Sequence, residues 1–310
     1  MKPCGRCASD QGEISMTTVA FLGLGIMGGP MARNLVRAGF DVIGFNRSRP
    51  PVDRLVEQGG RAADSIAEAV RAADVVVTML PDSSDVEEVV LGEGGVLASA
   101  KEGVLLIDCS TIRPETSKSV AATAERFGVR VLDAPVSGGE QGAIDGALSI
   151  MVGGAPEDFE AARPVLDAVG KTIVRVGPAG AGQTVKAANQ LIVAGNLELV
   201  AEAIVFLEAQ DVDTDAATKV LAGGLAGSAV LDRKSAGMFA REFTPGFRLA
   251  LHHKDLGIVE STARESGVVL PLGAVVSQLV AALVARGDGG LDHSALLKLA
   301  EELSGRGRKS

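Results

Sequence analysis

The chain contains no tyrosine and few histidines or cysteines. Of its 310 residues, three are histidine and three are cysteine. A catalytic tyrosine–lysine pair is therefore impossible, and a zinc centre with cysteine and histidine ligands is disfavoured. Cys4 and Cys7 have no second pair or histidine near them, so we expect no zinc or redox role there. A small, odd number of cysteines is typical of the reducing cytoplasm, where we expect this protein.

The sequence also lacks a surplus of positive charge and a long uninterrupted apolar run. Its 39 acidic residues outnumber its 30 basic ones, for a net charge of -9, so neither nucleic acid nor an anionic membrane is an expected partner. No uninterrupted apolar run reaches the roughly 20 residues that cross a bilayer. Residues 1–15 have no apolar signal-peptide core, and we interpret them as a flexible extension ahead of an alternative start at Met16.

A glycine-rich turn follows the first predicted strand, residues 18–22. A helix (30–38) and a second strand (42–45) come next, which is the context of a dinucleotide-binding βαβ unit. The first glycine allows the tight turn, the second lets the backbone approach the pyrophosphate, and the third permits close packing of helix on strand. The turn predicts six cofactor-binding residues: Gly23, Leu24, Gly25, Ile26, Met27 and Gly28.

Positive charge follows the second predicted strand, where an acidic residue would favour NAD. An aspartate or glutamate there hydrogen-bonds the ribose 2′-hydroxyl. This chain has the uncharged Asn46, while Arg47 and Arg49 supply charge that suits a 2′-phosphate. Two solvated surface arginines are the alternative. We predict that Asn46, Arg47 and Ser48 contact the cofactor and that NADP is preferred, with NAD still possible.

Strands and helices continue to alternate as far as residue 176, which predicts an α/β Rossmann-type doubly wound parallel sheet. Ligand-binding residues of such sheets lie at the carboxyl ends of the strands. Leu80 and Pro81 end one predicted strand (75–80), and Thr111 follows another (104–107). We therefore expect ligand-binding residues among Leu80, Pro81, Ser110 and Thr111. Cys109, in the same apolar stretch, is expected in the core.

A long apolar segment, residues 180–210, is predicted to form a central helix buried on most sides. Lys186 and Asn189 lie three residues apart and therefore on one face of it. After this helix only helical patterns follow, at 213–221, 249–265, 272–286 and 293–303, with Asp292 as a cap. We predict an extension (1–15), a dinucleotide-binding domain (16–180) and, joined through the central helix, an all-α C-terminal substrate and oligomerisation domain (181–310).

Two further segments carry candidate site residues. In the loop after strand 129–132, the glycines that follow Ser137 leave backbone N–H groups bare and suited to a carboxylate; an ordinary loop is the alternative. On helix 249–265, the adjacent histidines 252 and 253 point to different faces, so we predict no metal site there. Lys254 is either a second lysine near the active cleft or an ordinary surface lysine.

These motifs together resemble the β-hydroxyacid dehydrogenase family, which contains 3-hydroxyisobutyrate dehydrogenase and 6-phosphogluconate dehydrogenase. The likeness spans residues 18–304 and lies in the blocks FLGLGIMGGPMARNL, TMLPDS, DCSTI, DAPVSGG, GQTVKAANQ and HHKDL. It implies reduction of a short 3-oxo acid to the hydroxy acid. The stretches DAPVSGGEQGAIDGALSIMVGG, GGLAGSAVLD and FTPGFR carry a closer likeness, which implies tartronate semialdehyde as the substrate and glycerate as the product.

The resemblance also implies roles for individual residues. Leu80, Pro81 and Thr111 match cofactor contacts of the family. Lys186 matches the lysine that exchanges a proton with the substrate oxygen, and Asn189 matches a substrate-positioning asparagine. Lys254 matches a lysine at the nicotinamide end of the site, and the carboxylate-binding loop matches Ser137, Gly138 and Gly139. Decarboxylating relatives place a carboxylate two turns past the lysine, where this chain has Val193. The implied partners are a small anionic acid and further copies of the chain, as a homodimer or homotetramer.

Alternatives to this reading remain. Oxidation of 3-hydroxyisobutyrate and reduction of glyoxylate or succinic semialdehyde are alternative reactions. The non-enzymatic alternative is a dinucleotide-binding scaffold without catalysis. The joint presence of Lys186, Asn189 and the Ser137 loop argues against it. Imine reductases share the fold but generally lack the lysine.

Overall fold

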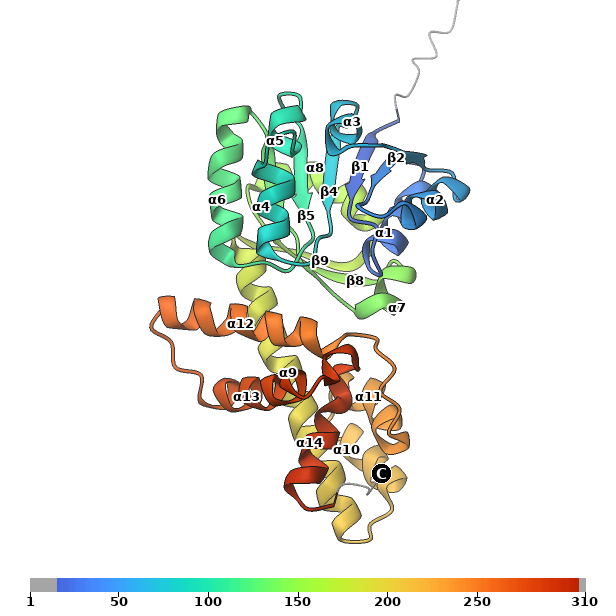
Figure 1. Cartoon of the computed structure of the whole chain (residues 1–310), viewed down its shortest axis with the longest axis vertical. Helices are drawn as coiled ribbons and strands as arrows, with labels where there is room; N and C mark the ends of the chain where they lie inside the picture. Colours follow the sequence, from blue (N-terminus) through green and yellow to red (C-terminus); the bar gives the residue numbers. More distant parts are fainter. Residues whose placement is uncertain (1–15, 307–310) are drawn as a thin grey trace, which may run out of the picture.

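The computed structural model describes residues 16–306. The predicted extension, with Cys4 and Cys7, lies outside the described residues. Figure 1 shows an α/β domain at one end of the molecule and a helical domain at the other, with α9 (Ala181–Ala209) running from the sheet through the helices. The predicted division at residue 180 falls between β9 and α9 and stays a prediction.

The sheet has the strand order β3-β2-β1-β4-β5-β6-β8-β7, and β9 pairs with β8. The strands are β1 (Thr18–Leu22), β2 (Asp41–Phe45), β3 (Arg61–Ala62), β4 (Val75–Thr78), β5 (Leu105–Asp108), β6 (Arg130–Asp133), β7 (Val136–Ser137), β8 (Leu148–Gly153) and β9 (Gly170–Gly177). From β3 to β6 every pairing is parallel. The predicted Rossmann-type fold is thereby confirmed.

The far edge of the sheet departs from the parallel pattern of the other strands. β8 runs antiparallel to β6 and to β7, while β9 is parallel to β8. The connection from β7 to β8 passes through only the short helix α7 (Gly139–Ile144). A connection this short favours an antiparallel partner, because a parallel crossover needs a dozen or more residues.

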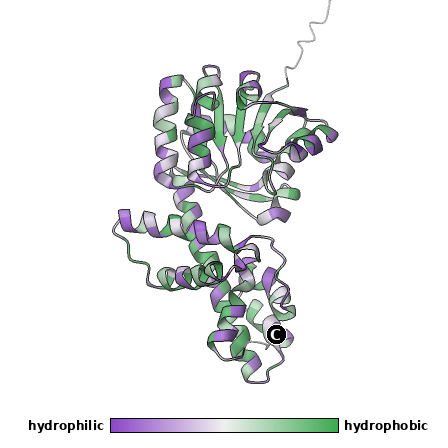
Figure 2. Ribbon diagram, viewed as in Figure 1, coloured by the Kyte–Doolittle hydropathy of each residue, from purple (hydrophilic) through white to green (hydrophobic). Residues whose placement is uncertain are grey.

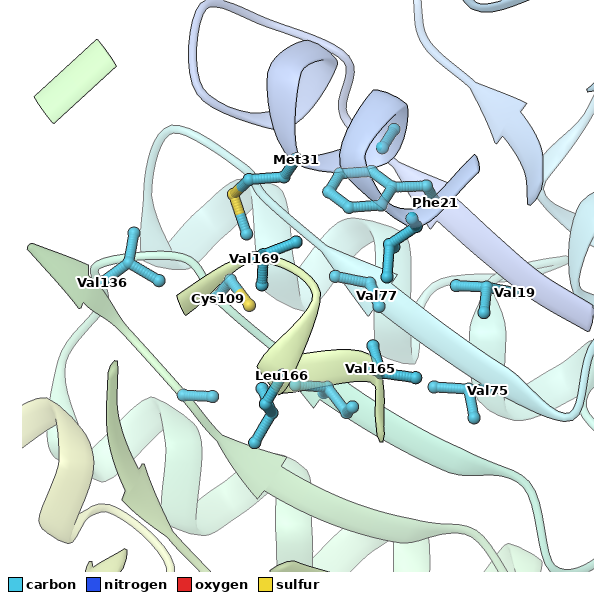
Figure 3. Packing of buried hydrophobic residues seen from close by; sticks show 14 of the residues in the cluster. Val19, Phe21, Met31, Val75, Val77, Cys109, Val136, Val165, Leu166 and Val169 are labelled. Atoms are coloured by element: carbon cyan, nitrogen blue, oxygen red, sulfur yellow. The ribbon is translucent and has the colours of Figure 1, made fainter. Parts of the chain in front are cut away.

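Helices cover both faces of the sheet because both sets of strand side chains are apolar. Val19 and Phe21 of β1 face the helices α1 (Gly28–Arg37), α2 (Arg49–Glu57) and α8 (Pro156–Asp167). Ala20 and Leu22 face the opposite layer, α3 (Ile66–Arg71), α4 (Ser83–Leu91), α5 (Val96–Ser99) and α6 (Pro114–Ala124). Figure 3 shows the first of these cores, which includes Cys109 as expected of a core cysteine.

The sequence patterns did not predict several helices and strands, most of which are short or have an unusual first turn. α2 has two prolines in its first turn, which resemble a loop, and α5 has only four residues. β7 lies within the segment predicted to be a loop (133–139), and α7 begins at its last residue, where consecutive glycines obscure both elements. α11 (Ala229–Ala240) was also missed. Predicted strand 75–80 ends early, at Thr78, so Leu80 and Pro81 lie just beyond it.

The helical domain is built around the second half of α9. Its other helices are α10 (Thr214–Ala222), α11, α12 (Leu249–Glu265), α13 (Pro271–Ala285) and α14 (Leu296–Leu303). Buried residues of α9, such as Leu197 and Ala201, pack against α11 to α14. Asp292 caps the turn before α14 as predicted, since its carboxylate accepts a hydrogen bond from the Ser294 amide at 3.1 Å.

α9 is only partly buried in the single chain. With 29 residues and a mean hydropathy of 1.7 in its most apolar window, it is long and apolar enough to cross a membrane, which the sequence reading did not anticipate. It instead packs against β8 at its start and against α11 to α14 further on, as the core helix of a globular fold does. However, Ile192, Leu199 and Phe206 are 63%, 62% and 67% exposed. The prediction of burial on most sides is wrong for this face.

Hydropathy follows the same layers. In Figure 2 the strands of the sheet are green, whereas the helices around them carry purple on their outward turns. This pattern is expected when helices shield a sheet that is apolar on both faces. The polar residues described next therefore stand out, because several of them lie inside the molecule.

Candidate active site

The glycine turn lies between β1 and α1 at the carboxyl end of the sheet. Gly23 has a φ of +97°, and a Cβ on it would lie 2.4 Å from the Met79 carbonyl oxygen. A Cβ on Gly28 would lie 1.9 Å from the Gly23 carbonyl oxygen. Both positions therefore require glycine. Gly25 has no atom within 4 Å of its Cβ position, so its backbone is open to an approaching group.

A hollow of about 330 Å³ opens beside this turn. β1 lies between β2 and β4 in the sheet, so the chain leaves β1 in one direction and returns to its other side as β4. Ligands of open α/β sheets bind at such a reversal of strand order. Of the predicted cofactor residues, the lining includes Gly23, Gly25, Asn46, Arg47, Leu80 and Pro81. The reversal of strand order and the bare glycine backbone fit a dinucleotide.

Asn46 connects the end of β2 to the glycine turn. Its Oδ1 accepts a hydrogen bond from the Leu24 amide at 3.0 Å, and its Nδ2 donates to Ser48 Oγ at 2.9 Å. Arg47 is 81% exposed and lies 3.5 Å from Asp85, a second residue at the rim of the hollow. Arg49, which the sequence suggested as additional charge, instead pairs with Asp53 and Asp64.

The ends of β4 and β5 are held together by buried polar residues. The Thr78 hydroxyl donates to Asp108 at 2.7 Å, and the Leu80 amide donates to the Ser110 hydroxyl at 2.9 Å. Burial raises the pKa of Asp108. These bonds fix the backbone at Leu80, Pro81 and Thr111, next to the hollow.

Lys254 extends from α12 to the segments that follow the carboxyl ends of β4 and β5. Its ammonium donates to the carbonyl oxygens of Thr111 at 2.6 Å and Pro81 at 3.0 Å. It also lies 3.1 Å from the Asp255 carboxylate. Three of the predicted site residues, which are far apart in sequence, therefore meet here.

Lys186 is buried in the second turn of α9, only 6% exposed. Its Nζ donates to the Val136 carbonyl oxygen at 2.7 Å. Burial lowers the pKa of Lys186 to about 8, although the nearby Asp255 carboxylate opposes this shift. A lysine with this pKa exchanges its proton readily near neutral pH.

The start of α9 is pinned to the sheet by residues that the sequence reading did not single out. The Asp133 carboxylate accepts hydrogen bonds from the amides of Gly180 (2.7 Å) and Gln183 (2.9 Å). Burial raises the pKa of Asp133, whereas these bonds lower it. The Gln183 side chain bonds both the Ser110 carbonyl and the Ile112 amide. The sequence gives no local sign of these contacts, because Asp133 and Gln183 lie 50 residues apart in the chain.

The predicted carboxylate loop lies against the same part of α9. The Ser137 hydroxyl is 3.5 Å from Asn189 Oδ1, a long hydrogen bond. Gly138 and Gly139 have φ values of +143° and +66°, which glycine adopts without strain. The loop therefore places Ser137 beside Asn189, and the preceding residue, Val136, contacts Lys186 through its carbonyl oxygen.

Asn189 leads to two buried residues that the sequence reading missed. Its Nδ2 donates to Gln190 Oε1 at 2.8 Å, and Gln190 Nε2 donates to Asp255 Oδ2 at 2.5 Å. Gln190 and Asp255 are 5% and 2% exposed. The sequence did hold a signal for both. Gln190 directly follows Asn189 and Asp255 directly follows Lys254, so each is a polar residue beside a predicted site residue.

The histidines do not form a metal site with other side chains. His252 is buried and its Nδ1 lies 3.0 Å from His293 Nδ1, while its Nε2 donates to the Gln190 carbonyl at 3.1 Å. Burial lowers the pKa of both rings. Within residues 16–306 no group of three or more His, Cys, Asp or Glu side chains could hold a metal ion.

Two family models cover the chain. Residues 18–177 match the NAD-binding domain of 6-phosphogluconate dehydrogenase, and residues 180–300 match the NAD-binding domain of NADP-dependent 3-hydroxyisobutyrate dehydrogenase. The chain belongs to the β-hydroxyacid dehydrogenase family. It is an NAD(P)-dependent oxidoreductase of that family, so its cofactor is a nicotinamide dinucleotide.

Individual relatives match over nearly their full length. The chain is 41% identical to 2-hydroxy-3-oxopropionate reductase of Escherichia coli over 91% of this chain and 97% of that protein. It is 40% identical to 3-hydroxyisobutyrate dehydrogenase of Pseudomonas aeruginosa, over 92% and 98%. The structure of Mycobacterium tuberculosis 3-hydroxyisobutyrate dehydrogenase with L-serine superposes with a TM-score of 0.83 at 37% identity, over 91% and 98%.

Proposed function

We propose that this protein reduces a short 3-oxo acid, tartronate semialdehyde (2-hydroxy-3-oxopropionate), to glycerate. The observation that carries the reaction type is the buried Lys186, whose ammonium donates to the Val136 carbonyl beside the Ser137 loop. The 41% identity to the E. coli reductase supports the choice of substrate. We also propose that the protein is cytoplasmic and that its dinucleotide-binding domain ends at residue 180.

The residues at the carboxyl ends of the strands would hold the cofactor. Gly23 to Gly28 would receive the pyrophosphate at the start of α1, and Asn46 to Ser48 the adenosine ribose. Leu80, Pro81, Thr111 and Lys254 would surround the nicotinamide end. The bound cofactor supplies a hydride in the reductive direction. The protein's own residues must therefore orient the substrate and provide the proton.

Lys186 supplies that proton in the proposed mechanism. As the aldehyde carbon is reduced, negative charge develops on its oxygen, and the ammonium both stabilises this charge and donates a proton to it. In the oxidative direction the neutral amine accepts the proton from the hydroxyl. The pKa of about 8 makes both forms accessible near neutral pH.

The carboxylate of the substrate would bind at Ser137, Gly138 and Gly139. The backbone N–H groups of the two glycines and the Ser137 hydroxyl are donors. The long bond from Ser137 to Asn189 (3.5 Å) leaves both side chains available to a substrate. Asn189 would then position the oxygen that Lys186 protonates.

A panel of substrates tests this proposal. kcat/KM should be measured for tartronate semialdehyde, 3-hydroxyisobutyrate, glyoxylate and succinic semialdehyde with NADPH or NADP as appropriate, and with NADH or NAD. Tartronate semialdehyde should give the highest value. A higher value for 3-hydroxyisobutyrate, which the Pseudomonas relative makes the second candidate, would replace the proposed substrate. Cofactor binding without turnover of any compound would support the scaffold alternative.

Cofactor preference depends on Arg47 in this proposal. Its exposed guanidinium at the rim of the hollow suits a 2′-phosphate. Arg47→Ala should remove a charge-assisted hydrogen bond worth about 1.5–3 kcal/mol and raise the KM for NADPH roughly tenfold to a hundredfold. The KM for NADH should change little, and Arg49→Ala, which removes charge outside the hollow, is the matched control. A wild type that already prefers NADH would contradict the proposal.

The pH dependence should follow Lys186. Reduction needs the ammonium, so kcat for reduction should fall as pH rises through about 8. Oxidation needs the neutral amine, so kcat for oxidation should rise over the same range. Steady-state rates in both directions between pH 6 and 10 would show the two curves crossing. Parallel curves would mean that another group exchanges the proton.

We further propose a homodimer or homotetramer in which apolar faces of the helical domain meet. α9 exposes Ile192, Leu199 and Phe206, which lie one above another at seven-residue spacing, and α13 exposes Leu272 and Val275. Ile192→Asp with Leu199→Asp should convert the oligomer to a monomer, as measured by light scattering at micromolar concentration. A monomeric wild type would disprove the proposal.

A further inference from the structure

Asp255 is a buried carboxylate that contacts both halves of the candidate site. One carboxylate oxygen accepts a hydrogen bond from Gln190 Nε2 at 2.5 Å, and the other lies 3.1 Å from Lys254 Nζ. Gln190 belongs to α9, which carries Lys186 and Asn189, whereas Lys254 reaches across to the sheet. One side chain, 2% exposed, therefore joins the substrate side to the cofactor side.

An ionised carboxylate accepts hydrogen bonds but donates none, so Asp255 sets the direction of the bonds that follow. Gln190 must turn its NH₂ group toward Asp255, which leaves Gln190 Oε1 facing Asn189. Asn189 then donates its own NH₂ group at 2.8 Å, and its Oδ1 faces Ser137. The orientation of the Asn189 amide at the proposed substrate site thus follows from a charge two side chains away.

Lys254 is held by three partners in this arrangement. Its ammonium donates to the Thr111 and Pro81 carbonyls and forms an ion pair with Asp255. Without the carboxylate the ammonium would lose its only charged partner among these contacts. Its position beside the proposed nicotinamide end would then be less restricted.

We propose that Asp255 is a positioning residue, which orients Asn189 through Gln190 and anchors Lys254 over the ends of β4 and β5. This role rests on the proposed function, since it takes Lys186, Asn189 and Lys254 as site residues. Asp255 acts through these residues and does not itself contact the reacting atoms.

The charges around Lys186 give the proposal a measurable signature. Asp255 raises the pKa of Lys186 and Lys254 lowers it, both from α12. His252, on the same helix, is uncharged at neutral pH because burial lowers its pKa. On the sheet side Lys186 meets the uncharged Val136 carbonyl. Removal of the Asp255 charge should therefore lower the pKa of Lys186, whereas removal of the Gln190 amide should not.

The test compares two variants. Asp255→Asn keeps the shape of the side chain but removes its charge. Gln190→Leu keeps the Asp255 charge but removes the hydrogen bonds that connect Asp255 to Asn189. Glu260→Gln, on the exposed side of α12, is the control. Three quantities are measured in the full-length protein: steady-state kcat and KM, NADPH affinity by fluorescence, and the titration of Lys186 by NMR of lysine-labelled protein, assigned with Lys186→Met.

Asp255→Asn should lower kcat by about tenfold to a hundredfold, as expected for a displaced catalytic group. It should also weaken NADPH binding and move the Lys186 titration to lower pH by about one pH unit. Gln190→Leu should raise the substrate KM without moving the titration. If Asp255→Asn leaves the titration and NADPH affinity unchanged, the proposal is wrong even where the wild type turns over its substrate.

The two readouts without substrate separate this proposal from the proposed function. Should no compound of the panel be turned over, the titration and NADPH affinity still decide the role of Asp255. Should Asp255→Asn not fold, as judged by circular dichroism, Gln190→Leu carries the test: an unchanged substrate KM would overturn the link from Asp255 to Asn189.

Discussion

Lys186→Ala should lower kcat by at least about 10², the low end of the effect of a lost general acid. The loss should appear in kcat more than in KM, because the proton is needed in the transition state and the substrate carboxylate is expected to bind at the Ser137 loop. NADPH affinity, measured by fluorescence, should remain nearly unchanged, since the proposed cofactor contacts lie at the glycine turn and the strand ends. A variant that keeps most of its kcat would remove Lys186 from the mechanism.

Lys186→Arg should not restore turnover. The guanidinium stays protonated at all accessible pH values, and its planar fork is larger than an ammonium. The space at Lys186 is limited, because its Nζ already lies 2.7 Å from the Val136 carbonyl and the residue is 6% exposed. The arginine variant therefore separates the need for an exchangeable proton from the need for positive charge.

The buried ammonium of Lys186 should also cost the fold stability. Because its pKa falls from 10.5 to about 8 on folding, the cost is present in full below pH 8 and disappears as pH rises past 10.5. At neutral pH it amounts to roughly 3 kcal/mol. The removal of the charge in the alanine variant offsets the cavity that the substitution leaves, so a loss of kcat in that variant should not reflect unfolding.

Local sequence patterns were sufficient to propose part of the candidate site. The glycine turn was recognisable because a strand preceded it and a helix followed, and the structure places a hollow beside it. Lys186 and Asn189 were recognisable because a buried apolar helix rarely contains them without a reason. In each of these cases neighbouring residues in the chain were sufficient.

The parts that the sequence did not predict depend on contacts between distant segments. Asp133 caps α9 from the end of β6, and Asp255 contacts Gln190 across two helices. Neither carboxylate has a local signature, because its partners lie far away in the chain. The antiparallel edge at β8 was missed for a similar reason: strand direction depends on pairing, whereas apolar patterns predict only that a strand exists.

Gly182 illustrates how such distant packing controls the site. It lies in the first turn of α9, where a Cβ would meet the Met151 carbonyl oxygen at 2.3 Å and the Asp133 carboxylate at 2.7 Å. Both atoms belong to the sheet, so the helix reaches its position only because this residue has no side chain. The place of Lys186, one turn further on, depends on this close approach.

Gly182→Ala should therefore push the start of α9 away from β6 and β8. Overpacking of this kind costs typically about 1–3 kcal/mol of unfolding free energy. A displacement of Lys186 by about 1 Å should reduce kcat by as much as about 10². Denaturant unfolding and steady-state rates on the same preparation measure both effects.

Gly195→Ala is the matched control in the same helix. No atom of the same chain lies within 4 Å of the Cβ position of Gly195, and a single methyl group there is small beside the Ile192 and Leu199 side chains that flank it on the exposed face of α9. Alanine there should be tolerated and, because glycine is unfavourable inside a helix, should stabilise the fold by up to about 1 kcal/mol. If Gly182→Ala behaved like this control, with stability and kcat both maintained, close packing of α9 on the sheet would not be what positions Lys186. Loss of kcat together with stability at Gly182 alone would show that the contact between helix and sheet holds the lysine in place.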